Sequence, residues 1–401
     1  MENVVAFFEG YADPEVETDN GISFDDSATP VSTAVTRVQQ LADRLARLLA
    51  GESKQVHTPS KGFLISTLNQ QQRSQLDKVL HLRYASAIGE QQRVLRTVRV
   101  QDQFEVMVHL RSMLSQRAEA RYNVFPFHPA CGLFAHQQRI HWLRREVAEK
   151  IAKAFAALNQ IGYLGHVEDC YRPEQVQVGL LLRRIMTIAR NHVEWSAEQV
   201  RDVAWSVTAP APALAGHQAG AAIDWRLQRK DVPGEPFCPL GNAVDIKHDY
   251  PAGNASSSMY FPYLTAEEWE TRTIYVTVME LLRMKVLASE DWHASWGDVG
   301  LGASRQVQSF AYYGPLKNFS REDGSVSPYI EPVFNDYLNL EEVSTIVRLA
   351  RENYTPNVHE TDPSGFDELL FRKIITALRR MNEPNKTHGR PFHQQWFHDD
   401  Q

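Results

Sequence analysis

One glycine stands between a histidine and an aspartate and restricts how this part of the chain can fold. The segment reads His217-Gln218-Ala219-Gly220-Ala221-Ala222-Ile223-Asp224. On a continuous strand its two ends would lie about 23 Å apart on opposite faces, and on a helix about 10 Å apart. A turn at Gly220 followed by a short buried strand could instead bring both side chains within the roughly 2 Å bonds that zinc needs. Taken alone, a His and an Asp at this spacing occur by chance in many proteins, and a core histidine with a surface carboxylate is the favoured interpretation.

A second segment, Glu290-Asp291-Trp292-His293, follows a predicted helix. We expect a helical turn or tight bend here, which would place Glu290 and His293 on one face. A catalytic zinc keeps a position open for water and needs a carboxylate nearby to carry that water's proton. By itself the tetrapeptide would be an exposed acidic pair beside a tryptophan. Together with His217, it predicts a third ligand and a base.

The third segment is Tyr171-Arg172-Pro173. A guanidinium keeps its charge at any working pH, and its rigid fork of donors suits a carbonyl oxygen that becomes an oxyanion. The alternative for Arg172 is a surface salt bridge.

We expect an α+β protein in which a small antiparallel sheet carries the zinc site, flanked by helices and extended by helical N- and C-terminal regions. The hydrophobic pattern indicates the individual helices and strands. Strands are expected at 163–167 and 221–223, and helices from Ser32 onward and at 76–82, 104–114, 142–158, 176–188, 265–286, 340–350 and 366–378.

The composition limits which kinds of partner and which cellular location we expect for the chain. The 401 residues carry a formal net charge of −7, which provides no basic field for nucleic acid. No apolar window approaches the roughly 18 residues of a membrane span. The three cysteines, Cys131, Cys170 and Cys238, are scattered, which favours a reduced, cytoplasmic location.

In order and spacing, these segments resemble the D-alanyl-D-alanine dipeptidases of the vancomycin-resistance type, a family of zinc peptidases. The family's Asp-x-Tyr-Arg-Pro motif is similar to Asp169 to Pro173, followed by Gln177. Its Ser-x-His-x-x-Gly-x-Ala-x-Asp motif is similar to residues 215–224, with Ala215 in place of the serine. Its Glu-x-Trp-His and Ser-x-Gly-Asp motifs are similar to residues 290–293 and 295–298, and its Met-Gly-Thr-x-Phe-Asp motif more loosely to residues 240–245.

The resemblance covers about residues 120–315 and implies a role for each site residue. One Zn²⁺ would be held by His217, Asp224 and His293, with Glu290 as general base and acid. Arg172 would polarise the scissile carbonyl, and Asp245 would receive the substrate's amino group. Tyr171 and Ala215 would line the substrate pocket. The substrate implied is a small peptide or amino-acid derivative such as D-Ala-D-Ala.

Four regions follow from the pattern and the resemblance. They are an acidic arm (1–30), a helical N-terminal extension (31–118), the dipeptidase-like catalytic domain (119–318), and a C-terminal helical extension with a histidine-bearing tail (319–401). The N- and C-terminal helices are candidate surfaces for homo-oligomerisation.

Two other functions remain open at this stage. Two histidines and a carboxylate also form the facial triad of non-haem iron(II) oxygenases, although that triad normally has a tighter His-x-Asp step. The chain could also be a catalytically inactive peptidase-like protein whose extra helices bind a partner. Such a protein would need neither the ligands nor Glu290.

Overall fold

The fold was analysed in a computed structural model of the 401-residue chain. The residues that the structure describes are 32–49, 64–65, 89, 92–123, 139–231, 263–264, 266–287, 290–300, 310–329, 334–353 and 368–382.

The helices are α3 (Ser32–Leu48), α5 (Leu110–Ser115), α6 (Arg145–Gln160), α7 (Glu174–Asn191), α8 (Ala197–Val207), α9 (Ala266–Leu281), α11 (Leu340–Glu352) and α12 (Glu368–Asn382), with the short 3-10 helix η2 (Pro212–Leu214). The strands are β1 (Leu64–Ile65), β2 (Arg99–Val100), β3 (Met107–His109), β4 (Ala120–Tyr122), β5 (Trp142–Arg144), β6 (Tyr163–Asp169), β7 (Ala222–Arg229), β8 (Tyr263–Leu264), β9 (Lys285–Leu287), β10 (Glu290–Ser295), β11 (Phe310–Ala311), β12 (Leu316–Phe319) and β13 (Val326–Pro328). This mixture confirms the α+β class.

The central sheet has five strands in the order β4-β6-β7-β10-β9. Neighbouring strands are antiparallel except for β4 and β6, which run parallel. Four two-stranded pairs accompany it: β1 with β8, β2 with β11, β3 with β5, and β12 with β13. The sheet is therefore mainly antiparallel, with one parallel pair.

Helices α6 and α9 cover one face of the sheet, with aromatic packing between them. The Trp225 ring of β7 is fully buried, 5.2 Å from the ring of Phe155 in α6 and 4.5 Å from that of Tyr275 in α9. Helix α3 packs on α9 and belongs to the same core. The large aromatic rings buried in this layer contribute to its apolar stability.

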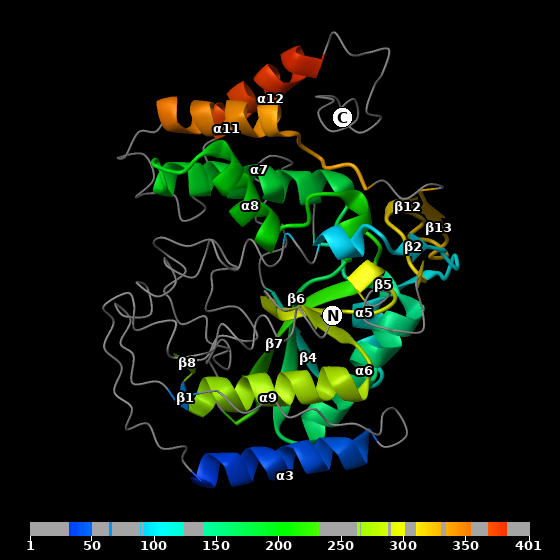
Figure 1. The fold of residues 1–401 in the computed structure, drawn as a ribbon. Coiled ribbons are helices and arrows are strands. Elements are labelled where there is room, and N and C mark those ends of the chain that lie inside the picture. The colour runs from blue at the N-terminus through cyan, green and yellow to red at the C-terminus, as the bar shows by residue number, and fades with distance from the viewer. Residues whose placement is uncertain are drawn as a thin grey trace.

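A second core joins α7 and α8 to the C-terminal helices α11 and α12. Figure 1 shows these four helices stacked on the other side of the sheet from α9 and α3. Two of them begin with a capping box, at Ser196 and Asn339, which satisfies the first amide donors of α8 and α11. The sheet therefore lies between two helical layers.

The structure corrects several of the expected elements. Residues 290–293 form the start of strand β10, not a helical turn, because His293 pairs directly with Asp224 of β7. Strand β3 interrupts the helix expected at 104–114, and Phe104 adopts a left-handed φ of 57°. The helix expected up to residue 286 ends at Leu281, and α8 was not predicted. No helix of the described residues is long and apolar enough to cross a membrane.

Candidate metal centre

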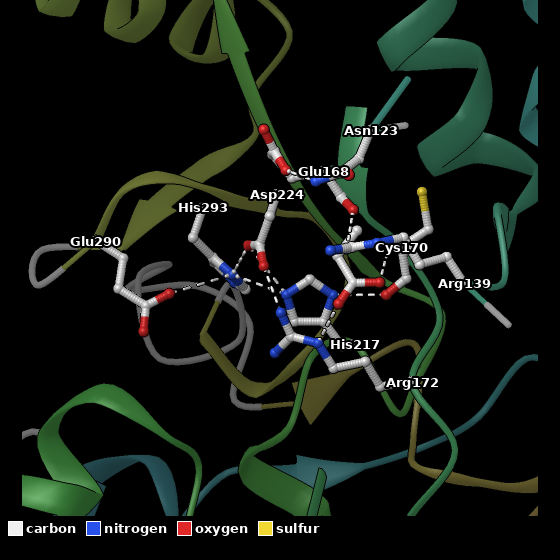
Figure 2. Close-up of polar contacts among 10 residues, drawn as sticks. Asn123, Arg139, Glu168, Cys170, Arg172, His217, Asp224, Glu290 and His293 are labelled. Atoms are coloured by element: carbon white, nitrogen blue, oxygen red, sulfur yellow. Dashed lines mark hydrogen bonds and ion pairs between the residues drawn. The ribbon is translucent and has the colours of Figure 1, made fainter. Parts of the chain in front are cut away.

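Three side chains from separate parts of the chain meet on the sheet. Asp224 lies in β7 and His293 in β10, and the two are directly opposite each other in the antiparallel register. His217 precedes β7 in the turn that follows η2. All three are buried, and one ligand atom of each lies within 4.8 Å of the others. Figure 2 shows the two imidazoles and the carboxylate pointing toward one another.

The spacing of these atoms fits a small divalent ion. His217 Nε2 lies 3.1 Å from Asp224 Oδ1 and 3.2 Å from His293 Nδ1, and His293 Nδ1 lies 3.0 Å from Asp224 Oδ1. Two ligands on one tetrahedral zinc, with bonds of about 2.0–2.1 Å, lie about 3.3 Å apart. The triangle of donors therefore has nearly the edge lengths that such an ion requires.

The turn between His217 and Asp224 forms as the glycine predicts. Gly220 has a φ of +68°, the left-handed conformation that a glycine adopts without steric cost. The Gly220 amide donates to the His217 carbonyl at 3.1 Å, which closes the turn. An added Cβ at Gly220 would lie 2.5 Å from the sulfur of Met107, so the position is also tightly packed.

Arg144 stabilises this turn through hydrogen bonds from its backbone and its side chain. Its backbone amide donates to the Gly220 carbonyl, and its Nε donates to the Ala219 carbonyl, both at 2.9 Å. The fully buried guanidinium also binds the Asp102 carboxylate at 2.7 Å. Because the Asp102 carboxylate and the turn both bind the same guanidinium, Asp102 of the N-terminal extension (31–118) supports the candidate metal ligand His217.

The second ring nitrogen of His217 has its own partner. His217 Nδ1 lies 2.6 Å from the Cys170 carbonyl, which can only accept a hydrogen bond. Nδ1 therefore carries the proton, and Nε2 presents its lone pair to the ligand triangle. Burial raises the pKa of the Cys170 thiol well above its usual value, so this cysteine is not a thiolate nucleophile.

Arg172 is joined to the same centre by two carboxylates. Its Nε donates to Asp169 at 2.6 Å, and one Nη donates to Asp224 Oδ2 at 2.5 Å. Burial acts to lower the pKa of Arg172, but the two carboxylates raise it above the usual value. The other guanidinium nitrogen, Nη1, makes no hydrogen bond to a described residue and can donate to a ligand.

Glu290 lies beside the triangle and not within it. Its Oε2 is 3.8 Å from His293 Nδ1, and Figure 2 shows Glu290 and Arg172 on opposite sides of the three ligands. Burial, reinforced by the charge of Asp224, raises the pKa of Glu290 to about 7, against the opposing effect of His293 and Arg172. A carboxyl group with such a pKa can both accept and release a proton near neutral pH.

The charges of the triangle favour a cation. Burial acts to lower the pKa of His293, yet the hydrogen bond and charge of Asp224 raise it overall. Burial would raise the pKa of Asp224, but its electrostatic interactions with His217 and Arg172 hold it well below its usual value. An ionised carboxylate between two imidazoles is a favourable place for a positive charge, whether a proton or a metal ion.

The remaining predicted residues lie in different surroundings. Tyr171 is buried in an apolar cluster with Met107 and Leu316 and contacts the ring of Phe319 edge-on at 5.1 Å. Ala215 is buried in the turn, where its carbonyl accepts from the Gln218 amide. Asp245 lies outside the described residues, as do the acidic arm and the histidine-bearing tail.

Sequence reasoning gave no role to two charged residues that support the centre, Asp169 and Arg144. Asp169 belongs to the motif quoted for the resemblance, and its spacing of three residues from Arg172 often joins opposite charges. Arg144 had no such signal, because its partners Asp102 and Ala219 are remote in sequence.

Comparison with known proteins adds no family assignment: no family model matches the chain, and no curated protein matches it significantly in sequence.

Proposed function

We propose that the chain is a zinc-dependent hydrolase that cleaves the amide bond of a small peptide or amino-acid derivative. The observation that carries the proposal is the convergence of His217, Asp224 and His293 with a fourth residue, Glu290, beside them and outside the ligand triangle. A site that only stored a metal would have no use for a proton carrier at that position. The resemblance to D-alanyl-D-alanine dipeptidases supports the same reaction class.

Each residue of the candidate site has a role in the proposed reaction. A zinc ion held by the three ligands would supply Lewis-acid chemistry and bring the pKa of a water molecule toward 7. Glu290, with a pKa of about 7, takes the proton from the attacking water and returns it to the leaving amine. Arg172 offers its Nη1 donors to the carbonyl oxygen as negative charge develops there.

Asp169 acts on Arg172 and does not act on substrate. Its Oδ2 accepts from Arg172 Nε, while its Oδ1 accepts from the Cys170 amide at 3.0 Å. The Cys170 carbonyl in turn accepts from His217. The Asp169 side chain and the Cys170 carbonyl, which are adjacent in the chain, therefore orient the guanidinium and one candidate metal ligand.

Replacing Glu290 by Gln tests the proposal. We expect the purified E290Q chain to keep one zinc per chain and to lose about 10²- to 10⁴-fold in kcat on any substrate that the wild type cleaves. The control is Glu341→Gln, which removes a carboxylate from the exposed first turn of α11. Substrates would come from a library of D,D, L,D and L,L dipeptides and N-acyl amino acids, with mass detection.

Three results would contradict the proposal. Full turnover by E290Q would remove Glu290 from the reaction. Elemental analysis that finds iron and no zinc in protein purified without added metal would favour the non-haem oxygenase, which shares the ligand types. Tight binding of a peptide that is never cleaved would support the inactive, peptidase-like protein.

A further inference from the structure

Strand β10 is irregular in the stretch that carries Glu290 and His293. In a regular strand, side chains three residues apart point to opposite faces of the sheet, so only one of these two would reach the metal centre. Yet Glu290 Oε2 lies 3.8 Å from His293 Nδ1, and Figure 2 shows the Glu290 carboxylate directed toward that ring. The backbone between the two residues therefore departs from a regular strand.

The pairing of β10 with β9 locates this departure. Glu290 pairs with Leu287, whereas Ala294 pairs with Val286, the neighbour of Leu287. Four steps along β10 thus correspond to one step along β9, and residues 291–293 form a bulge on this edge of the strand. Bulges of this kind redirect side chains next to functional sites. Here the bulge lets the carboxylate and the imidazole share one face of the sheet.

A fully buried ion pair lies within the bulge. Asp291 Oδ2 is 3.2 Å from an Nη of Arg272 in α9, and both side chains are 0% exposed. The pair links the first residue of the bulge to the helix that covers one face of the sheet. Two charges removed from water are costly, and a well-packed apolar pair would stabilise the fold as much or more. What the ion pair adds is direction, because its hydrogen bond forms in one geometry only.

We propose that Asp291 and Arg272 are positioning residues, whose ion pair fixes the bulge in the arrangement that brings Glu290 to the metal centre. The inference rests on the proposed function, in which Glu290 carries the proton. Neither residue is a ligand, and both act through Glu290. Proton transfer requires the carboxylate within hydrogen-bond reach of the water, and a misplacement of about 1 Å can lower the rate by about 10²-fold.

The first test is structural and needs no turnover. Crystal structures of the full chain, freed of metal with a chelator, are compared for the wild type, Asp291→Asn and Tyr163→Phe. We expect the wild type and Y163F to keep the separation of 3.8 Å between Glu290 Oε2 and His293 Nδ1. In D291N the Glu290 carboxylate should move away from the ring by about 1 Å or more.

Tyr163→Phe is the matched control. The Tyr163 hydroxyl donates to the Glu270 carboxylate of α9 at 2.9 Å, so this variant also removes a polar link between α9 and the sheet. Tyr163 lies at the start of β6 and pairs with Arg229, whereas the other end of β6 pairs with Asp224. The control therefore loses a comparable contact away from the metal centre.

The second test is kinetic. D291N should lose about 10- to 100-fold in kcat with little change in KM, and Y163F should stay within about twofold of the wild type. Adding D291N to E290Q should cause no further loss, because Asp291 acts through Glu290. A general structural role would instead multiply the two losses. Arg272→Lys keeps the cation and should lose less than D291N.

If D291N does not fold, the double variant Arg272→Met with Asp291→Leu replaces it, since this pair leaves no buried charge without a partner. The same displacement and the same loss in kcat are expected, because an apolar contact has no fixed direction. An unmoved Glu290 in the variant that folds, or a full further loss on top of E290Q, would overturn the positioning role. If Glu290 is displaced but the wild type cleaves no amide in the substrate library, the positioning role stands and the hydrolase does not.

Discussion

Replacing Gly220 by alanine should destabilise the chain and weaken its metal site. The φ of +68° is unfavourable for an L side chain by about 1–2 kcal/mol. The new Cβ would also lie 2.5 Å from the sulfur and 2.7 Å from the terminal carbon of Met107, which is 1% exposed. Overpacking of this kind costs about 1–3 kcal/mol. The sum is about 3 kcal/mol of unfolding free energy, within a range of about 2–5 kcal/mol.

Gly162→Ala is the matched control. Gly162 has a φ of +93°, but an added Cβ there would meet nothing within 4 Å. It therefore carries the backbone cost without the clash, and should lose about 1–2 kcal/mol. Urea unfolding of the two variants would measure the difference, and competition with a chelator would measure zinc affinity. We expect the zinc dissociation constant to rise about tenfold or more in G220A, because the turn positions His217, and to stay unchanged in G162A. Equal destabilisation and equal zinc binding in both variants would refute the idea that this turn is packed to place the ligand.

Three further predictions concern residues around the site. Arg144→Met should lower the unfolding free energy by about 3–5 kcal/mol and weaken zinc binding, since it leaves the buried Asp102 carboxylate without its cation; urea titration and chelator competition would show both effects. Tyr337→Phe removes the hydrogen bond of 2.6 Å to Gln218, the neighbour of His217, and should cost about 1–3 kcal/mol in urea titrations. Burial lowers the pKa of His141 from 6.5 to about 4, so its neutral form stabilises the folded state fully above about pH 6.5, and this contribution is lost as the pH falls toward 4. Unfolding free energies at pH 7 and pH 5 should differ by about 2 kcal/mol more in the wild type than in His141→Gln, and equal differences would contradict this assignment.

Much of the candidate site could be predicted because its residues lie in short segments. The turn at Gly220 follows from the conformational freedom of glycine and the distance limits on His217 and Asp224. The segment 290–293 was assigned the wrong local structure, since a spacing of three residues suggests a helical face. The strand pairing that actually brings His293 opposite Asp224 is a contact between residues 69 apart in the chain. Such a register cannot be derived from either segment alone.

The residues that support the turn carrying His217 could not be predicted from the sequence. The N-terminal extension (31–118) has no recognisable site motif. Its Asp102 nevertheless binds Arg144, whose side chain and backbone stabilise the turn that carries His217. From the other end of the chain, Tyr337 donates to the side chain of Gln218. The ligand turn is thus fixed between segments that lie before and after the motifs, and its rigidity depends on contacts with large sequence separation. A fragment limited to residues 120–315 would contain all three ligands, Glu290 and Arg172, but would lack Asp102 and Tyr337. We therefore expect such a fragment to bind zinc more weakly than the whole chain, even if it folds.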